Sequence, residues 1–159
     1  MEKLPIIGIT MGDPSGVGPE IIVKALTDPE IYSYCRPVVL GDPGILSQFL
    51  KYAQGVSVYI YEITDIEKAE GVPGRLDVVP LSRLKPDDAV PGRPSKEGGR
   101  AMAGYIVAAV EMAKKGRISA MVTCPISKTL LNDAGYSFEG HTQLIANLTG
   151  TKEYVMMLA

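Results

Sequence analysis

Four short stretches of the chain contain residues whose types and spacing could bind a small anionic molecule. The first, ITMGDPSGVGPEI (residues 9–21), places three glycines and Asp13 between two apolar runs. A glycine-rich turn that enters a helix exposes backbone N–H groups at the positive end of the helix dipole, which suits an anion. The spacing lacks the lysine of a P-loop, and Ile21 stands where a dinucleotide-binding loop needs its third glycine. Spacing alone slightly favours a tight strand-to-helix turn, whereas Asp13 favours a cleft, because a carboxylate there could orient a hydroxyl, an amine or a cofactor.

The second stretch, TCPISKTLLNDAG (residues 123–135), follows an apolar run and begins a helical pattern. Ser127 and Lys128 stand at the start of that helix, where the ammonium group could pair with a phosphate or a carboxylate as a point charge. Residue type alone favours the alternative, a lysine that is simply solvated at the surface. Both residues are therefore retained as possible members of a pocket.

The third stretch, SFEGHTQLIA (residues 137–146), contains the single histidine of the chain. His141 and Thr142 enter a helix directly after Gly140, so the ring, the hydroxyl and the helix N–H groups could together bind an anionic ligand. In the alternative interpretation Thr142 only caps the helix and His141 is an incidental surface residue. The sequence leaves the two interpretations evenly balanced.

The fourth stretch, GRPSKEGGRAM (residues 92–102), lies at the end of a loop rich in proline, glycine and charge. Ser95 is a suitable N-cap for the long helical pattern that follows. A capped helix start with small residues for close packing is the favoured interpretation, and a wall of the ligand cleft is the alternative.

Composition restricts the classes of function. The 159 residues are 46% hydrophobic and 21% charged, which is typical of one soluble domain with a core. The net charge of −2 shows no basic excess, so a nucleic-acid partner is not expected. The first apolar run is too short for a signal sequence or a membrane span, so a cytoplasmic location is expected.

Cysteine and histidine usage restricts metal chemistry. Cys35 and Cys124 have no zinc-finger spacing, and although their number permits a disulfide, a reduced cytosolic setting is favoured. One histidine cannot supply a catalytic metal site built on several histidines within a single copy of the chain.

The elements that must position these stretches alternate between strand and helix. Strands are expected at residues 4–10, 36–41, 56–63, 75–81, 118–125 and 152–159, and helices at residues 19–31, 42–54, 98–116, 126–135 and 141–150. This alternation predicts an α/β fold with a largely parallel sheet. Ligands of such sheets bind outside the carboxyl ends of the strands, where the four stretches are expected to lie.

Taken in order, the four stretches resemble the signature segments of the 4-hydroxythreonine-4-phosphate dehydrogenase family of vitamin B6 biosynthesis. The segments that carry the resemblance are GITMGDPSGVGPEI, GRPSKEGGRAM, VTCPISK and GHTQLIA. The resemblance implies an isocitrate/isopropylmalate dehydrogenase-like α/β/α sandwich that works as a homodimer. It further implies that His141 and Thr142 match the family's substrate-binding pair, whereas Asp13, Ser127 and Lys128 are pocket candidates from their placement alone.

The family's reaction defines the expected substrate and cofactors. Its members use NAD or NADP to oxidise 4-phosphooxy-L-threonine to 2-amino-3-oxo-4-phosphooxybutanoate, which loses carbon dioxide to give 3-amino-2-oxopropyl phosphate. A divalent metal ion, with zinc, magnesium or cobalt as the candidates, binds at the dimer interface and acts as a Lewis acid. Oxidation of a phospho-threonate or phospho-erythronate is the related activity that the sequence does not distinguish.

The chain departs from the family in length. Family members are about twice as long, and their metal-binding histidines lie beyond the region that corresponds to residue 159. We therefore expect residues 1–159 to be a single α/β N-terminal portion of a longer two-domain dehydrogenase, with no metal ligands of its own. A catalytically incomplete binding fragment is the remaining alternative.

Overall fold

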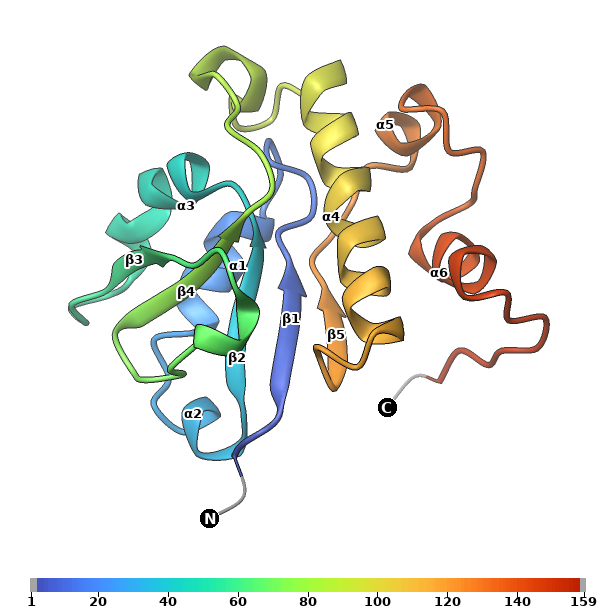
Figure 1. Cartoon of the computed structure of the whole chain (residues 1–159). Helices are drawn as coiled ribbons and strands as arrows, with labels where there is room; N and C mark the ends of the chain where they lie inside the picture. Colours follow the sequence, from blue (N-terminus) through green and yellow to red (C-terminus); the bar gives the residue numbers. More distant parts are fainter. Residues whose placement is uncertain (1–2, 158–159) are drawn as a thin grey trace.

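The computed structural model describes residues 3–157 and contains one five-stranded sheet with helices on both faces (Figure 1). The strands are β1 (Ile6–Thr10), β2 (Arg36–Gly41), β3 (Tyr59–Glu62), β4 (Arg75–Pro80) and β5 (Ala120–Thr123). They lie in the order β3-β4-β2-β1-β5, and every neighbouring pair is parallel. The expected α/β fold with a parallel sheet is confirmed.

Side chains of the central strands alternate between two apolar layers, as the period of two requires. On β2, Val39 belongs to one hydrophobic cluster, whereas Val38 and Leu40 belong to another. All three side chains are fully buried. The sheet is therefore covered on both faces, which is the usual arrangement for an all-parallel sheet.

The helices divide between these two layers. The helices are α1 (Gly18–Ala25), α2 (Ile31–Tyr34), α3 (Pro43–Phe49), α4 (Lys96–Lys114), α5 (Lys128–Asp133) and α6 (His141–Thr149). Helices α1 and α3 pack on one face, and α4 crosses the other face over β1, β2 and β5 (Figure 1). Helices α5 and α6 pack against α4 through a third apolar cluster beside the β5 edge.

The predicted helix boundaries are partly corrected. Ser95 caps α4 as expected, because its Oγ accepts a hydrogen bond of 2.8 Å from the N–H of Gly98. The single helix expected at residues 19–31 is wrong, because α1 ends at Ala25 and α2 begins at Ile31. Pro29 explains the break, since the residue before a proline is disfavoured in helical conformation.

The strand expected at residues 152–159 is also wrong over the residues that the structure describes. Residues 152–157 contain no strand, and residues 158 and 159 lie outside the described range. The apolar side chains that suggested a buried strand are exposed, with Val155 at 95% and Met157 at 87% of full accessibility. An apolar run becomes a strand only when it pairs with a neighbour, and this one has none among residues 3–157.

Two further properties concern the chain as described. Across residues 3–157, none of the helices combines the length and the apolar character needed to span a bilayer. Cys35 and Cys124 are both free thiols, so the disulfide that their number permits is not formed.

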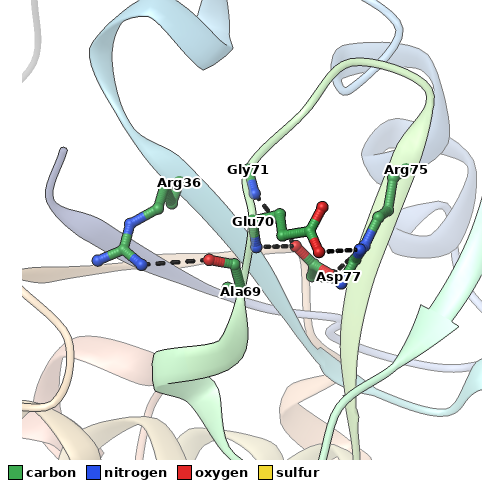
Figure 2. Close-up of polar contacts among 6 residues, drawn as sticks. All are labelled: Arg36, Ala69, Glu70, Gly71, Arg75 and Asp77. Atoms are coloured by element: carbon green, nitrogen blue, oxygen red, sulfur yellow. Dashed lines mark hydrogen bonds and ion pairs between the residues drawn. The ribbon is translucent and has the colours of Figure 1, made fainter. Parts of the chain in front are cut away.

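A cluster of charged residues stabilises the amino-terminal edge of the sheet (Figure 2). The carboxylate of Asp77 on β4 accepts hydrogen bonds from the N–H groups of Glu70 and Gly71 and from Nε of Arg75, at 2.9, 3.2 and 2.8 Å. Arg75 also pairs with the Glu70 carboxylate at 2.8 Å. The side chain of Asp77 is 1% exposed and that of Arg75 is 8% exposed, so this ion pair lies inside the molecule.

We predict that Asp77→Ala strongly destabilises the chain. The change leaves the buried guanidinium of Arg75 without its main partner, which typically costs about 3–5 kcal/mol. Urea unfolding followed by circular dichroism would measure the loss. Glu62→Ala removes the carboxylate of an exposed pair with Arg83 and should lower the free energy of unfolding far less. Equal losses in the two variants would contradict the importance of the buried cluster.

Candidate functional site

The glycine loop, residues 11–17 between β1 and α1, packs tightly against residues Cys124 and Pro125 that follow β5. The N–H of Asp13 donates a hydrogen bond of 3.0 Å to the Pro125 carbonyl. Gly12 has a φ of +73°, and a Cβ atom there would lie 2.4 Å from the same oxygen. The glycine at position 12 is therefore required both by backbone conformation and by the close approach of the Cys124–Pro125 segment.

Asp13 is partly exposed, and its side chain also helps to form the loop. Its Oδ1 accepts a hydrogen bond of 2.9 Å from the N–H of Ser15, which is the pattern of an Asx turn. Val17 occupies the N-cap position of α1 and provides no side-chain cap. The loop therefore presents a half-buried carboxylate beside the N-terminus of α1, where no side chain caps the first turn.

His141 lies against the same segment as the glycine loop. It is the first residue of α6, and its Nε2 is 3.1 Å from the Cys124 carbonyl oxygen. Because Asp13 binds the adjacent Pro125 carbonyl, two stretches far apart in the sequence meet at the carboxyl end of β5. The Cys124 carbonyl thus holds the ring of His141 in a defined position at this end of the sheet.

Thr142 is placed differently from its neighbour. Gly140 is the N-cap of α6 and no side chain caps this helix, so the interpretation of Thr142 as a helix cap is wrong. Thr142 lines a hollow of about 220 Å³ formed by α6 and the segment that follows it. The other residues of this hollow are Ile145, Ala146, Thr149, Thr151 and Tyr154. The structure therefore places Thr142 on the wall of a hollow that His141 does not line.

Ser127 and Lys128 have separate roles at the start of α5. The Oγ of Ser127 accepts a hydrogen bond of 3.3 Å from the N–H of Leu130, so Ser127 is a helix cap. Lys128 is exposed and forms no ion pair with a carboxylate of residues 3–157. Its Cε atom lies 3.9 Å from the place of a Cβ on Gly140. The Lys128 side chain therefore lies beside Gly140, the N-cap residue of α6.

The loop that precedes α4 packs against the glycine loop. The N–H of Gly92 donates a hydrogen bond of 2.8 Å to the Ser15 carbonyl. A hollow of about 350 Å³ lies between the glycine loop, the end of α3 and residues Pro91 and Gly92. This loop is thus a wall beside the glycine loop, as well as the capped start of a helix.

Asp42 follows β2 at the carboxyl ends of the strands, and the sequence analysis did not select it. Its Oδ1 accepts from the N–H of Ile45 at 3.1 Å, and its Oδ2 accepts from the N–H of Leu84 at 2.7 Å and from Oγ of Ser82 at 2.8 Å. Ser82 in turn lies 2.6 Å from the hydroxyl of Tyr105, whose pKa is raised by burial. Asp-Pro after a strand predicts a helix cap, but no sequence signal reveals the bonds to residues 82 and 84.

Residues 3–157 form no metal site by themselves. Within the part of the chain that the structure describes, no three or more His, Cys, Asp or Glu side chains form a group that could hold one. No chemical step at this edge is therefore assigned to a metal ligand of this chain.

Comparison with known proteins identifies the family. Residues 33–159 match the family model described as pyridoxal phosphate biosynthetic protein PdxA. The chain belongs to the PdxA family. This match includes the Cys124–Pro125 segment and His141 and covers three of the four signature stretches, whereas residues 8–21 lie before the matched range.

Named relatives and a solved structure agree with this assignment. The chain is 48% identical over 160 residues to a 4-hydroxythreonine-4-phosphate dehydrogenase from Desulfosudis oleivorans. It is 37% identical over 153 residues to Clostridium botulinum proteins provisionally named D-threonate 4-phosphate dehydrogenase. The crystal structure of a 4-hydroxythreonine-4-phosphate dehydrogenase from Burkholderia phymatum superposes with a TM-score of 0.85 at 41% identity.

These matches cover nearly all of this chain but only part of each relative. The matches cover 100%, 96% and 96% of this PdxA-family chain, respectively, but only 46% of each of the longer proteins. The chain therefore spans less than half the length of the relatives that it matches. Its fold corresponds to the matching portion of the dehydrogenase structure.

We predict that the Cys124 thiol does not react with alkylating reagents in the folded chain, although the backbone carbonyl of this residue lies in the site. Cys124 is 5% exposed, and burial raises its pKa from 9.0 to about 11. Iodoacetamide at about pH 8 should label the more accessible Cys35 first and Cys124 only on unfolding, as peptide mass spectrometry would show. Labelling of both thiols at equal rates in the folded chain would contradict this.

The burial of the Cys124 thiol also predicts that the stability of the chain falls as the pH rises. The unfolded thiol ionises near its ordinary value of 9.0, whereas the folded Cys124 thiol stays protonated until about pH 11. Its contribution is therefore complete below pH 9.0 and is lost as the pH rises through the interval up to about 11. Urea unfolding across this interval should show a smaller loss of stability in Cys124→Ala than in the parent chain. An equal loss in both would contradict the prediction.

Proposed function

We propose that this chain is the N-terminal, substrate-binding portion of a longer two-domain, homodimeric dehydrogenase. The complete enzyme would use NAD or NADP to oxidise 4-phosphooxy-L-threonine to 2-amino-3-oxo-4-phosphooxybutanoate. Loss of carbon dioxide would then give 3-amino-2-oxopropyl phosphate in vitamin B6 biosynthesis. The printed names of the relatives and the family match support this proposal.

The observation that carries the proposal is the convergence at the Cys124–Pro125 segment. The imidazole of His141 and the loop that contains Asp13 both bind backbone carbonyls of this segment. Lys128 adds a positive charge at the start of the neighbouring helix. An imidazole, a carboxylate and an ammonium group at the carboxyl edge of a parallel sheet suit a zwitterionic phosphorylated substrate.

The roles proposed for these residues are binding and orientation. His141 and Thr142 would hold the substrate by hydrogen bonds, with Thr142 contributing from the side of its own hollow. Lys128 would interact with an anionic group, and Asp13 would orient a hydroxyl or an amine. Since the glycine loop lacks both nucleotide fingerprints and the described residues form no metal cluster, hydride transfer is not assigned to any of these side chains.

Oxidation of D-threonate 4-phosphate is the second candidate, and the provisional names of the Clostridium botulinum relatives favour it. The two substrates share a phosphate and a secondary alcohol, and they differ in an amine against a hydroxyl. A third outcome is that the isolated chain binds substrate without turning it over. Assays of both substrates with a full-length enzyme that contains this chain, and with the chain alone, separate the three.

We predict that His141→Ala lowers kcat/KM of that full-length enzyme for 4-phosphooxy-L-threonine by roughly 10–100-fold. A hydrogen bond that involves a charged group contributes about 1.5–3 kcal/mol, and each 1.4 kcal/mol is about tenfold. The rate of formation of reduced nicotinamide measures the effect. Asn147→Ala changes an exposed residue of the same helix and should leave kcat/KM unchanged.

Two results would contradict the proposal. Unchanged kinetics of His141→Ala would remove the histidine from substrate binding. Absence of turnover by the parent enzyme with both phosphorylated acids, in the presence of nicotinamide cofactor and each candidate metal, would overturn the dehydrogenase assignment. Faster turnover of D-threonate 4-phosphate would instead favour the second candidate.

A further inference from the structure

We infer that the backbone carbonyl of Cys124 fixes His141 as the Nε2–H tautomer and leaves Nδ1 as a hydrogen-bond acceptor for the ligand. Cys124 is thereby a positioning residue that acts through its main chain. The ligand part of this inference rests on the proposed function, because it assigns a hydroxyl or an ammonium group of the substrate to Nδ1. The tautomer part concerns the chain alone.

The tautomer follows from the chemistry of the two atoms that meet. The Cys124 carbonyl oxygen lies 3.1 Å from Nε2 of His141, and a carbonyl oxygen can only accept a hydrogen bond. Nε2 must therefore carry the proton of the bond. In the neutral ring only one nitrogen is protonated, so Nδ1 keeps its lone pair.

The carbonyl is a rigid partner because its segment is fixed on several sides. The N–H of Cys124 donates a hydrogen bond of 3.2 Å to the Thr10 carbonyl, which continues the pairing of β5 with β1. The adjacent Pro125 carbonyl accepts the hydrogen bond from Asp13, and Gly12 packs directly against both residues. Such a carbonyl orients the ring much as a carboxylate orients a histidine in other sites.

The free nitrogen then determines what the histidine can recognise. None of the residues described makes a hydrogen bond to Nδ1 of His141. An acceptor nitrogen recognises a donor, and a phosphorylated hydroxy-amino acid offers donors at its secondary hydroxyl and its ammonium group, whereas its phosphate oxygens mainly accept. Lys128 has only donors and is suited to the acceptor groups. We therefore assign the hydroxyl or ammonium end to His141.

The single histidine allows a direct test of the tautomer. The 159-residue chain labelled with ¹⁵N-histidine gives the ring signals of His141 alone. At about pH 8 we expect a protonated Nε2 with slow exchange of its proton and an unprotonated Nδ1. The same chain in urea serves as the reference for an unrestrained ring. A protonated Nδ1, or a folded spectrum equal to that in urea, would overturn the inference.

Two glycine variants test whether the segment restrains the ring. Gly12→Ala places a Cβ 2.4 Å from the Pro125 carbonyl oxygen and should shift the His141 signals toward those of the chain in urea. Gly104→Ala meets nothing within 4 Å on α4 and should leave the signals unchanged. Backbone amide spectra establish that each variant is folded. A folded Gly12→Ala variant with unchanged ring signals would contradict the restraint, and if it does not fold, the parent spectrum still decides the tautomer.

Two substitutions of His141 test the recognition of a donor in the full-length enzyme. The side-chain amide of asparagine can place an acceptor near the position of Nδ1, whereas that of glutamine reaches the position of Nε2. We expect His141→Asn to retain a several-fold higher kcat/KM than His141→Gln. Equal values or the reverse order would overturn the assignment of Nδ1 to the substrate. Because the tautomer is measured without substrate, its failure is distinguishable from failure of the proposed function.

Discussion

Two consecutive backbone carbonyls at the end of β5 hold the candidate site together. Cys124 accepts from the His141 ring and Pro125 accepts from the N–H of Asp13. The parallel register brings Thr10 of β1 beside Thr123 of β5, so both strands end at the same level. The loops that follow them must therefore meet, and the carbonyls that the sheet no longer uses become available to both. The contact between the glycine loop and this segment is a consequence of sheet topology.

This dependence on main-chain atoms explains which side chains are restricted. A backbone carbonyl cannot be removed by substitution, so the sequence controls the contact through the residues that allow close approach. Gly12 does so at the Pro125 carbonyl, and Gly18 does so where a Cβ would lie 2.1 Å from the Met11 carbonyl. At the amino-terminal ends of the strands the contacts are made by side chains instead, in the buried ion pair of Arg75 and Asp77 (Figure 2). The amino-terminal edge therefore contributes mainly stability, whereas the carboxyl edge combines stability with exposed polar groups.

The sequence predicted local features more accurately than contacts between distant residues. The five strands of the sheet and the Ser95 cap follow from apolar patterns and capping preferences, which depend on neighbouring residues. The break before Pro29 was predictable from the same local rules and was missed. The bond between His141 and Cys124 was not predictable, because it depends on how α6 returns to the sheet across the intervening α5. The strand expected at residues 152–159 failed for a related reason, since residues 152–157 have no neighbouring strand within the described chain.

The polar groups at the carboxyl ends of the strands are suited to binding a ligand more than to oxidising it. The net charge of the chain is −2, so in the proposed function the attraction of a phosphorylated substrate would come from local features and not from the overall electrostatic field of the chain. Those features are present at the carboxyl edge: an exposed ammonium group on Lys128, an α1 N-terminus without a side-chain cap, and a fixed imidazole. In the proposed function these groups would bind or orient the substrate, because Nε2 of the imidazole already contacts a carbonyl and Asp13 already contacts the turn. In a protein family whose named members are more than twice as long, this supports the proposal that the substrate is recognised partly on this portion, while transfer of the hydride would depend on groups that these residues do not supply.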